Sequence, residues 1–308
     1  MKLLYIASEN RSGSTLLDLL LGGHSQTFGV GEISRLHQFF QRNDPCTCGQ
    51  FVQNCPTWSD VFVELHERGF NVENFETRVR NRPRRLPIPS LAELSFMTGK
   101  MASRFAFLPP VKRSLVAAER VWSVCDILHQ KHRCDWIVDS SKRAEQLSAM
   151  YVVRPEDIRV LHLVRDGRAV SYSMATRTGN SFERATRSWL LNSHLQLKLQ
   201  NPIPAAQKLF LKYEDLCKNP TRTLSLICEF MEIDYEESML HPSVKERHNI
   251  GGSPRKHDSG ELKISLDERW ISAMTDSQAK FFDRWAGKLN MRFGYSRDVP
   301  QRNEGVSA

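Results

Sequence analysis

Short apolar runs alternate along this chain with longer segments of helical periodicity. Four of the runs have the length and composition of buried β-strands, at residues 3–7, 135–138, 158–164 and 208–212. Helical patterns follow them, for example at residues 16–21, at 169–177 and after Pro220. Repeated strand–helix alternation is typical of α/β proteins, so the pattern predicts a parallel β-sheet flanked by helices on both faces.

Each predicted strand ends in a cluster of polar residues that can bind an anion. The four clusters are Arg11-Ser12-Gly13-Ser14-Thr15, Asp139-Ser140-Ser141-Lys142, Arg165-Asp166-Gly167-Arg168 and Lys212-Tyr213-Glu214-Asp215. In a parallel sheet the carboxyl ends of the strands open onto one crevice, where such folds bind ligands. We therefore expect the four clusters to meet in space, although they lie far apart in the sequence.

The first cluster has the form of a phosphate-binding loop, in which a strand leads through a polar turn into a helix. Backbone N–H groups and the helix dipole favour an anion at such a point. Arg11 adds a fixed cation, and Ser14 and Thr15 can donate hydrogen bonds. The nucleotide-hydrolysis pattern G-x-x-x-x-G-K-[ST] is absent, because Ser8 and Ser14 stand where it requires glycine and lysine. A serine-rich helix cap is the plainer interpretation of this loop.

Glu32 is a candidate general base. It follows Arg11 by 21 residues, which allows one helix to run out and the chain to return over the loop. A carboxylate at that position could accept a proton from a reacting group. It could equally be the acidic residue at the start of a helix over residues 33–40, and the spacing alone does not decide between the two.

Composition narrows the class of protein less than these motifs do. The 308 residues allow one or two domains, and 40% hydrophobic with 25% charged residues is ordinary for a globular protein. A net charge of +8 suits a polyanionic ligand without identifying it. One basic run is either a solvated loop or a contact for an acidic acceptor or surface; it contains Arg78, Arg80, Arg82, Arg84 and Arg85.

The cysteines and the apolar runs bear on location and on metal binding. Of seven cysteines, Cys46, Cys48 and Cys55 lie close together, but their spacing fits no standard zinc pattern and a fourth ligand would have to come from elsewhere. We expect free or paired thiols and no metal, and the role of these three residues stays open. No signal peptide and no 18-residue apolar run are visible, so we expect a cytoplasmic protein or a separated catalytic domain without a membrane span.

A resemblance to a known family rests on the first and third clusters. Arg165 follows a strand, and Ser173 stands eight residues further on within the next predicted helix. This arrangement resembles the 3′-phosphate motif of sulfotransferases, with Ser171 as the alternative serine. The loop around Gly13, whose basic residue precedes the glycine, resembles their 5′-phosphosulfate loop. Leu16 stands in place of the aromatic residue of the cytosolic steroid and phenol enzymes, so the chain is nearer to the bacterial and secretory-pathway branch.

Other segments extend the resemblance over nearly the whole chain. Tyr213 begins a Y-E-D-L segment similar to one whose tyrosine lies near the adenine in the family. Residues 249–256 resemble the late basic loop that closes over the 3′-phosphate, with Arg255 as its candidate. The resemblance implies a P-loop-type sulfotransferase fold in one domain over residues 1–295, with residues 68–121 laid over the acceptor pocket and residues 296–308 as a flexible tail.

The family also implies a reaction. Its members transfer a sulfuryl group from 3′-phosphoadenylyl sulfate (PAPS) in line to a hydroxyl or amine, release 3′,5′-bisphosphate (PAP) and need no metal. Glu32 would be the base, while Arg11 and Lys142 would stabilise the leaving group; Lys142 resembles a D-K-T-P lysine displaced by two residues. The residues expected to hold the donor are Arg11, Ser12, Gly13, Ser14, Thr15, Arg165, Ser173, Tyr213 and Arg255.

The acceptor would be a small molecule, a glycan or a lipid, with no nucleic-acid partner. Which acceptor is used, and whether an oxygen or a nitrogen is sulfated, does not follow from the sequence. The alternative functions are a P-loop kinase-like phosphotransferase, which should show G-K-[ST] and a magnesium-binding aspartate, and a non-catalytic nucleotide-binding protein.

Overall fold

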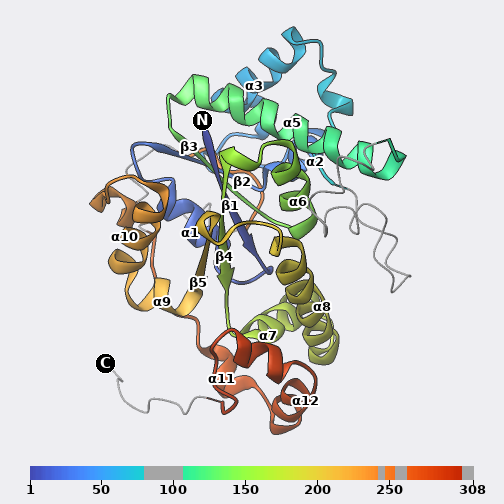
Figure 1. Ribbon diagram of the computed structural model, residues 1–308. Helices are drawn as coiled ribbons and strands as arrows, with labels where there is room; N and C mark the ends of the chain where they lie inside the picture. The colour runs from blue at the N-terminus through green and yellow to red at the C-terminus, as the bar shows by residue number, and fades with distance from the viewer. Residues whose placement is uncertain (80–106, 242–246, 254–261, 300–308) are drawn as a thin grey trace.

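The computed structural model describes residues 1–79, 107–241, 247–253 and 262–299. Its centre is a five-stranded sheet of order β2-β3-β1-β4-β5, in which every neighbouring pair is parallel (Figure 1). The strands are β1 (Lys2–Ser8), β2 (Thr27–Gly31), β3 (Trp136–Lys142), β4 (Ile158–Val164) and β5 (Lys208–Lys212). The four strands predicted from the apolar runs are β1, β3, β4 and β5, so the expected α/β fold class is confirmed.

Strand β2 is the element that the apolar pattern did not predict. Its sequence, Thr-Phe-Gly-Val-Gly, carries two glycines, which are depleted in strands and interrupt the apolar run. All five residues are nevertheless buried, and β2 pairs in parallel with β3 at the edge of the sheet. Gly31 has φ 77°, and a Cβ there would lie 2.1 Å from the carbonyl oxygen of Ile250. Glycine is needed where this segment approaches so closely.

Alternate residues of β1 face two separate hydrophobic cores. Leu3, Tyr5 and Ala7 belong to a core shared with helices on one face of the sheet, whereas Leu4 and Ile6 belong to the core on the other face. The first face carries α2 (Leu36–Arg42), α3 (Pro56–Glu67), α5 (Pro109–His132) and α6 (Ala144–Val153). The second carries α1 (Ser14–Leu21), α9 (Tyr213–Lys218) and α10 (Pro220–Met231).

A further group of helices packs around the carboxyl end of β4. They are α7 (Gly167–Thr178), α8 (Phe182–Gln200), α11 (Arg269–Ala273) and α12 (Asp276–Arg292), and Figure 1 shows them together below the sheet. Trp189 of α8 and Phe282 of α12 lie against Gly167, where a Cβ would be 2.6 Å and 2.7 Å from their rings. The short 3₁₀ helices are Ile33–Arg35, Val52–Asn54, Val72–Asn74, Pro155–Asp157, Ala205–Gln207 and Glu237–Leu240.

The first residues of the predicted tail are held by the domain. Arg168, which is buried and paired with Asp166, donates hydrogen bonds to the carbonyls of Ser296, Arg297 and Asp298 at 2.9–3.1 Å. The remainder of the predicted tail, from residue 300, lies outside the described residues. Among the helices that the structure describes, none has both the length and the apolar character that crossing a membrane requires.

Candidate active site

The loop between β1 and α1 turns through two left-handed residues. Arg11 has φ 72° and Gly13 has φ 85°, so the peptide N–H groups between Ser8 and Ser14 are turned away from the regular directions of strand and helix. A Cβ on Gly13 would lie 2.3 Å from the ring of Tyr213. The glycine is therefore required both by its backbone conformation and by the tyrosine packed against it.

Arg165 joins the third cluster to this loop. Its guanidinium lies 4.7 Å from the centre of the Tyr213 ring, and it donates to the carbonyl of Arg11 at 3.1 Å and to that of Asp267 at 2.7 Å. The side chain is buried, so these contacts hold a permanent cation at the base of the crevice.

Ser173 rather than Ser171 faces the crevice. The Nε of Arg11 donates to the Ser173 hydroxyl at 3.0 Å, although the two residues are 162 positions apart. Ser171 is fully buried on the other side of α7, and its hydroxyl has no hydrogen-bond partner among the described residues. Both arginines and Ser173 line a cavity of about 260 Å³ that also contains Arg269 and Trp270.

A larger cavity of about 420 Å³ adjoins the loop. Arg11, Gly13, Ser14, Thr15, Arg165 and Tyr213 line it, together with Glu32 and Lys142. The structure thus brings together nearly all of the donor-binding residues expected from the sequence. Arg255 lies outside the described residues.

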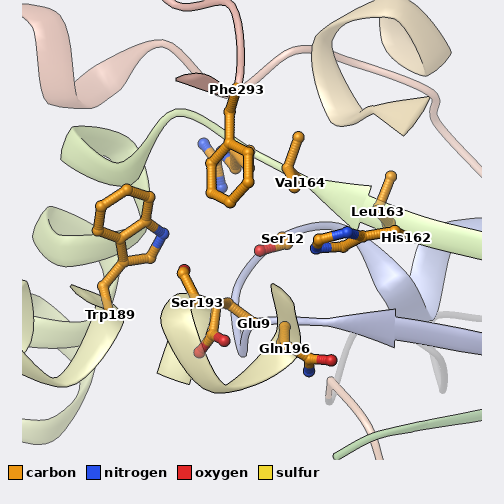
Figure 2. Close-up of a pocket in the computed structure, with 10 residues that line it drawn as sticks. Glu9, Ser12, His162, Leu163, Val164, Trp189, Ser193, Gln196 and Phe293 are labelled. Carbon is orange, nitrogen blue, oxygen red and sulfur yellow. The ribbon is translucent and has the colours of Figure 1, made fainter. Parts of the chain in front are cut away.

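Ser12 is the exception, because its side chain does not line either of these cavities. It is buried and faces a small enclosed cavity of about 10 Å³ behind the loop, shared with Glu9 and with Trp189 and Ser193 of α8 (Figure 2). In this loop the side chain of Ser12 points into the protein, so its expected part in donor binding would have to come from its backbone N–H group. The spacing of R-S-G-S-T could not show this orientation, since it depends on the left-handed turn at Arg11.

Glu32 and Lys142, which both line the larger cavity, form a partly buried ion pair. Arg35 donates to the second carboxylate oxygen of Glu32 at 3.3 Å. Burial acts to raise the pKa of Glu32, but Lys142 and Arg35 outweigh it and lower that pKa below its ordinary value. Lys142 is the last residue of β3 and has φ 71°, a turn that helps to bring its side chain beside Glu32.

Backbone N–H groups of a late loop complete this end of the site. Gly252 donates to Glu32 Oε1 at 3.1 Å, and Ser253 donates to Thr15 Oγ1 at 3.1 Å. Ile250 bonds to the end of β2, since its N–H donates to Val30 and its carbonyl accepts from Glu32, at 3.1 and 2.8 Å. The late loop predicted to close over the donor therefore contacts both the candidate base and the first loop.

A further cavity, of about 310 Å³, lies on the other side of the Glu32–Lys142 pair from the larger cavity. Asn10, Glu32, Arg35 and Lys142 line both this cavity and the larger one, so they separate the two spaces. Its other polar lining residues are Ser8, Glu9, Arg78, Ser141, Arg143, Glu145, Asn192 and Gln196. Arg78 belongs to the 68–121 segment expected over the acceptor pocket; residues 80–106 of that segment lie outside the described residues.

Gln196 was not recognised from the sequence, yet it positions two of the strand ends. Its amide donates to the carbonyls of Ser8, at 3.2 Å, and of Lys142. One side chain of α8 therefore links the ends of β1 and β3. No local signal marks a glutamine in the middle of a helix for this role, because the contact exists only after the helix packs on the sheet.

Comparison with solved structures identifies the fold. The sulfotransferase domain of the Synechococcus PCC 7002 olefin synthase aligns over 97% of this chain and 95% of its own, with 22% identity and a TM-score of 0.58. The sulfotransferase domain from the curacin biosynthetic pathway aligns over 95% of each chain, with 18% identity and a TM-score of 0.51. The chain therefore has the fold of sulfotransferase domains.

Sequence comparison finds a similarity to the same class of enzyme. Residues 95–237, which include Lys142, Arg165, Ser173 and Tyr213, match the sulfotransferase family. Over 160 residues, the chain is 26% identical to protein-tyrosine sulfotransferase A of Caenorhabditis elegans, a match that covers 48% of this chain and 41% of that protein. The chain thus spans about two fifths of the length of this relative. Over these residues the chain is similar in sequence to sulfotransferases.

Glu9 provides a test of the buried side of the loop. Burial raises its pKa to about 8 from an ordinary 4.5, so folding holds a proton that the unfolded chain releases. Its contribution to stability is complete below pH 4.5 and is lost as the pH rises to about 8. Glu9→Gln should therefore gain stability relative to the natural protein between pH 5 and 8, by roughly 2–4 kcal/mol at about 1.4 kcal/mol per pKa unit.

Urea unfolding of the natural protein and of Glu9→Gln, at pH 5 and at pH 8, measures this difference in stability. Other buried groups, such as Asp139 and His162, titrate in both proteins and cancel in the difference. If the difference in stability between the two proteins is the same at pH 5 and at pH 8, Glu9 is ionised in the folded protein over this range and its pKa is not raised.

Proposed function

We propose that this protein transfers a sulfuryl group from 3′-phosphoadenylyl sulfate to a hydroxyl or amine of an acceptor and releases 3′,5′-bisphosphate. The observation that carries the proposal is the contact of Arg11 with Ser173 and Arg165. It joins the two anion-binding segments into one crevice, as a donor with phosphate at both ends of its ribose requires. The match of residues 95–237 to the sulfotransferase family supports the same reaction.

The cavities of about 420 and 260 Å³ next to the loop would each bind a different part of the donor. The loop N–H groups, Ser14 and Thr15 suit the 5′-phosphosulfate, because the α1 N-terminus adds positive potential there. Arg165 and Ser173 suit the 3′-phosphate, since guanidinium binds phosphate bidentately. Tyr213 offers a ring face beside Arg165 for the adenine.

Glu32 and Lys142 lie between the larger cavity, of about 420 Å³, and the cavity of about 310 Å³. We assign the larger cavity to the donor and the cavity of about 310 Å³ to the acceptor. Glu32 would take the acceptor's proton, and the acceptor atom would then attack sulfur in line. Negative charge develops on the bridging oxygen of the leaving group, where Arg11, Lys142 and the loop N–H groups stabilise it. No step in this scheme requires a metal.

The acceptor cavity carries an excess of positive charge among its described residues. Arg35, Arg78 and Arg143 line it, and burial together with the other two guanidinium groups lowers the pKa of Arg78. Glu145 lies 3.7 Å from Arg143 and offsets part of this charge. An acceptor with an anionic group near its hydroxyl or amine would relieve the repulsion. The relative named for tyrosine sulfation makes a phenolic hydroxyl the first acceptor to test.

We also propose a cytoplasmic location, where thiols stay reduced. All seven cysteines are free thiols in the structure, although the sulfur atoms of Cys46, Cys48 and Cys55 lie close together.

The first test of the donor assignment is Arg165→Ala. Loss of a charge-assisted contact costs about 1.5–3 kcal/mol, so 3′,5′-bisphosphate should bind tenfold more weakly or worse. Adenosine 5′-phosphosulfate, which lacks the 3′-phosphate, should bind nearly as before. Calorimetric titration with both ligands makes the comparison, and any general damage to the loop lowers both affinities. Equal losses would refute the assignment.

The test of the base is Glu32→Gln. The amide keeps the size of the carboxylate but cannot take a proton, so turnover should fall by roughly 10²–10⁴ while bisphosphate affinity barely changes. The acidic limb of the kcat/KM profile for the donor, which reports the free enzyme and is expected below the ordinary pKa of 4.5, should disappear with it. Release of bisphosphate with a working acceptor gives the rate.

The matched control is Glu145→Gln. It removes a carboxylate from the same cavity, but one that pairs with Arg143 instead of Lys142. Its turnover should stay within about tenfold of the natural protein, far above that of a protein without its base. A Glu32→Gln protein that is less stable yet fully active would assign Glu32 to the folding of the helix start instead.

The charge of the acceptor cavity is tested with Arg78→Gln. Acceptors should be supplied in pairs that differ only by a carboxylate, such as 4-ethylphenol and 3-(4-hydroxyphenyl)propionate. The natural protein should have the lower KM for the carboxylated member, and Arg78→Gln should raise that KM about tenfold with little effect on the neutral one. A preference for the neutral acceptor in the natural protein would contradict the assignment.

A further inference from the structure

Three cysteines and one histidine, distant in sequence, gather at a point outside the reaction crevice. Cys46, Cys48 and Cys55 come from the segment after α2, and His248 precedes the late loop. The three sulfur atoms and a ring nitrogen of His248 all lie within 4.8 Å of one another. Cys46, Cys55 and His248 are buried, and Cys48 is half-buried.

The distances within this cluster fit a shared metal ion better than a disulfide. Cys55 Sγ lies 3.6 Å from Cys46 Sγ, 3.6 Å from Cys48 Sγ and 3.1 Å from His248 Nδ1. A disulfide would place two sulfurs at about 2.05 Å and exclude the third. Bonds of about 2.3 Å to sulfur in a tetrahedron place ligand sulfurs roughly 3.8 Å apart.

The local backbone is built to hold these four side chains. Cys46 and Cys48 lie on a tight turn that closes with Gly49 N–H on the Cys46 carbonyl at 3.1 Å, where Gly49 has φ 87°. Thr47 pairs with Asn249 in both directions, through Asn249 N–H on Thr47 Oγ1 at 2.8 Å and Thr47 N–H on the Asn249 carbonyl at 3.2 Å. Trp58 Nε1 donates to the His248 carbonyl at 2.8 Å.

We propose that Cys46, Cys48, Cys55 and His248 bind one structural zinc ion. Three thiolates and one imidazole form a complete tetrahedral ligand set, which is the closed type of site that stabilises a fold and leaves no position for substrate. Soft thiolate ligands with imidazole favour zinc over magnesium or calcium. The sequence favoured free or paired thiols because the fourth ligand is 193 residues away from Cys55.

The zinc ion would fix the late loop against the reaction site. His248 is followed within four residues by Gly252, whose N–H donates to Glu32, and then by Ser253, whose N–H donates to Thr15. Tethering His248 to the cysteine turn therefore restrains the two N–H groups that contact the candidate base and the first loop. The metal site has a structural role at a distance from the chemistry, and it does not depend on the proposed function.

Metal analysis of the full chain, purified under reducing conditions without chelator, tests the site. One zinc ion per chain is expected. Cys48→Ser and His248→Gln should each lose most of it, while the matched controls Cys217→Ser and His66→Gln should retain it. Cys48 and His66 are at least partly exposed, which limits damage to the core. Removal of zinc should lower the melting temperature and increase hydrogen exchange at residues 249–253.

Reconstitution of the natural protein with cobalt checks the ligand set even if the variants fold poorly. Thiolate-to-cobalt charge-transfer bands and the intense d–d bands of a tetrahedral ion are expected. Zinc retained equally by all four variants, or an octahedral cobalt spectrum, would overturn the proposal. So would metal-free natural protein in which thiol titration finds five free thiols in place of seven, because a disulfide would then occupy the cluster.

Discussion

The central strand β1 is hydrogen-bonded on both edges and buried on both faces, and its register decides where the reactive residues lie. It pairs Ala7 with Lys142 of β3 and Ser8 with Leu163 of β4. Because both neighbours run parallel to it, the residues that follow these positions emerge at the same edge as the loop around Gly13. A slip of one residue would turn the apolar residues of β1 toward the wrong cores, so burial enforces the register.

This convergence gathers cations in a small volume, and the protein has to compensate for them. Arg11, Lys142 and Arg165 lie around the larger cavity, which we propose binds the donor, and Glu32 and Asp267 are their acidic neighbours there. Carbonyl groups of Arg11 and Asp267 accept from Arg165 and hold its guanidinium in place. A dianionic phosphate, as in the proposed donor, would find opposite charge and hydrogen-bond donors already in place there, so little of the site would have to reorganise.

Much of this could be predicted from the sequence, for physical reasons. Strands β1, β3 and β4 were visible because they are almost entirely buried and contain apolar runs, and β5 was visible as a short apolar run between two lysines, although Phe210 is exposed at this edge of the sheet. The anion-binding clusters follow from where those runs end. Strand β2 was missed because Gly29 and Gly31 break its apolar run, although close packing of Ile250 is what requires Gly31.

Other features could not be predicted because they depend on tertiary packing. The choice between Ser171 and Ser173 depends on which face of α7 turns toward the loop, and the side-chain direction of Ser12 depends on the left-handed Arg11. The contacts of Gln196 and the meeting of His248 with the cysteines join positions far apart in the sequence. A local pattern has no access to such pairings.

The pair formed by Glu32 and Lys142 links the two halves of the proposed reaction. In the structure Lys142 and Arg35 lower the pKa of Glu32 against the effect of burial, and a carboxylate stabilised in this way is a weak base. The proposed reaction needs the Lys142 ammonium at the bridging oxygen of the leaving group, and Lys142 lines the donor cavity from which it could reach that atom. Attraction to the anionic donor would draw the ammonium away from Glu32 and so weaken one of the two cationic influences that lower the carboxylate's pKa, while Arg35 would remain. Glu32 would then be a stronger base when the donor is present than in the free protein, which favours deprotonation of the acceptor where a sulfuryl group is ready to be transferred.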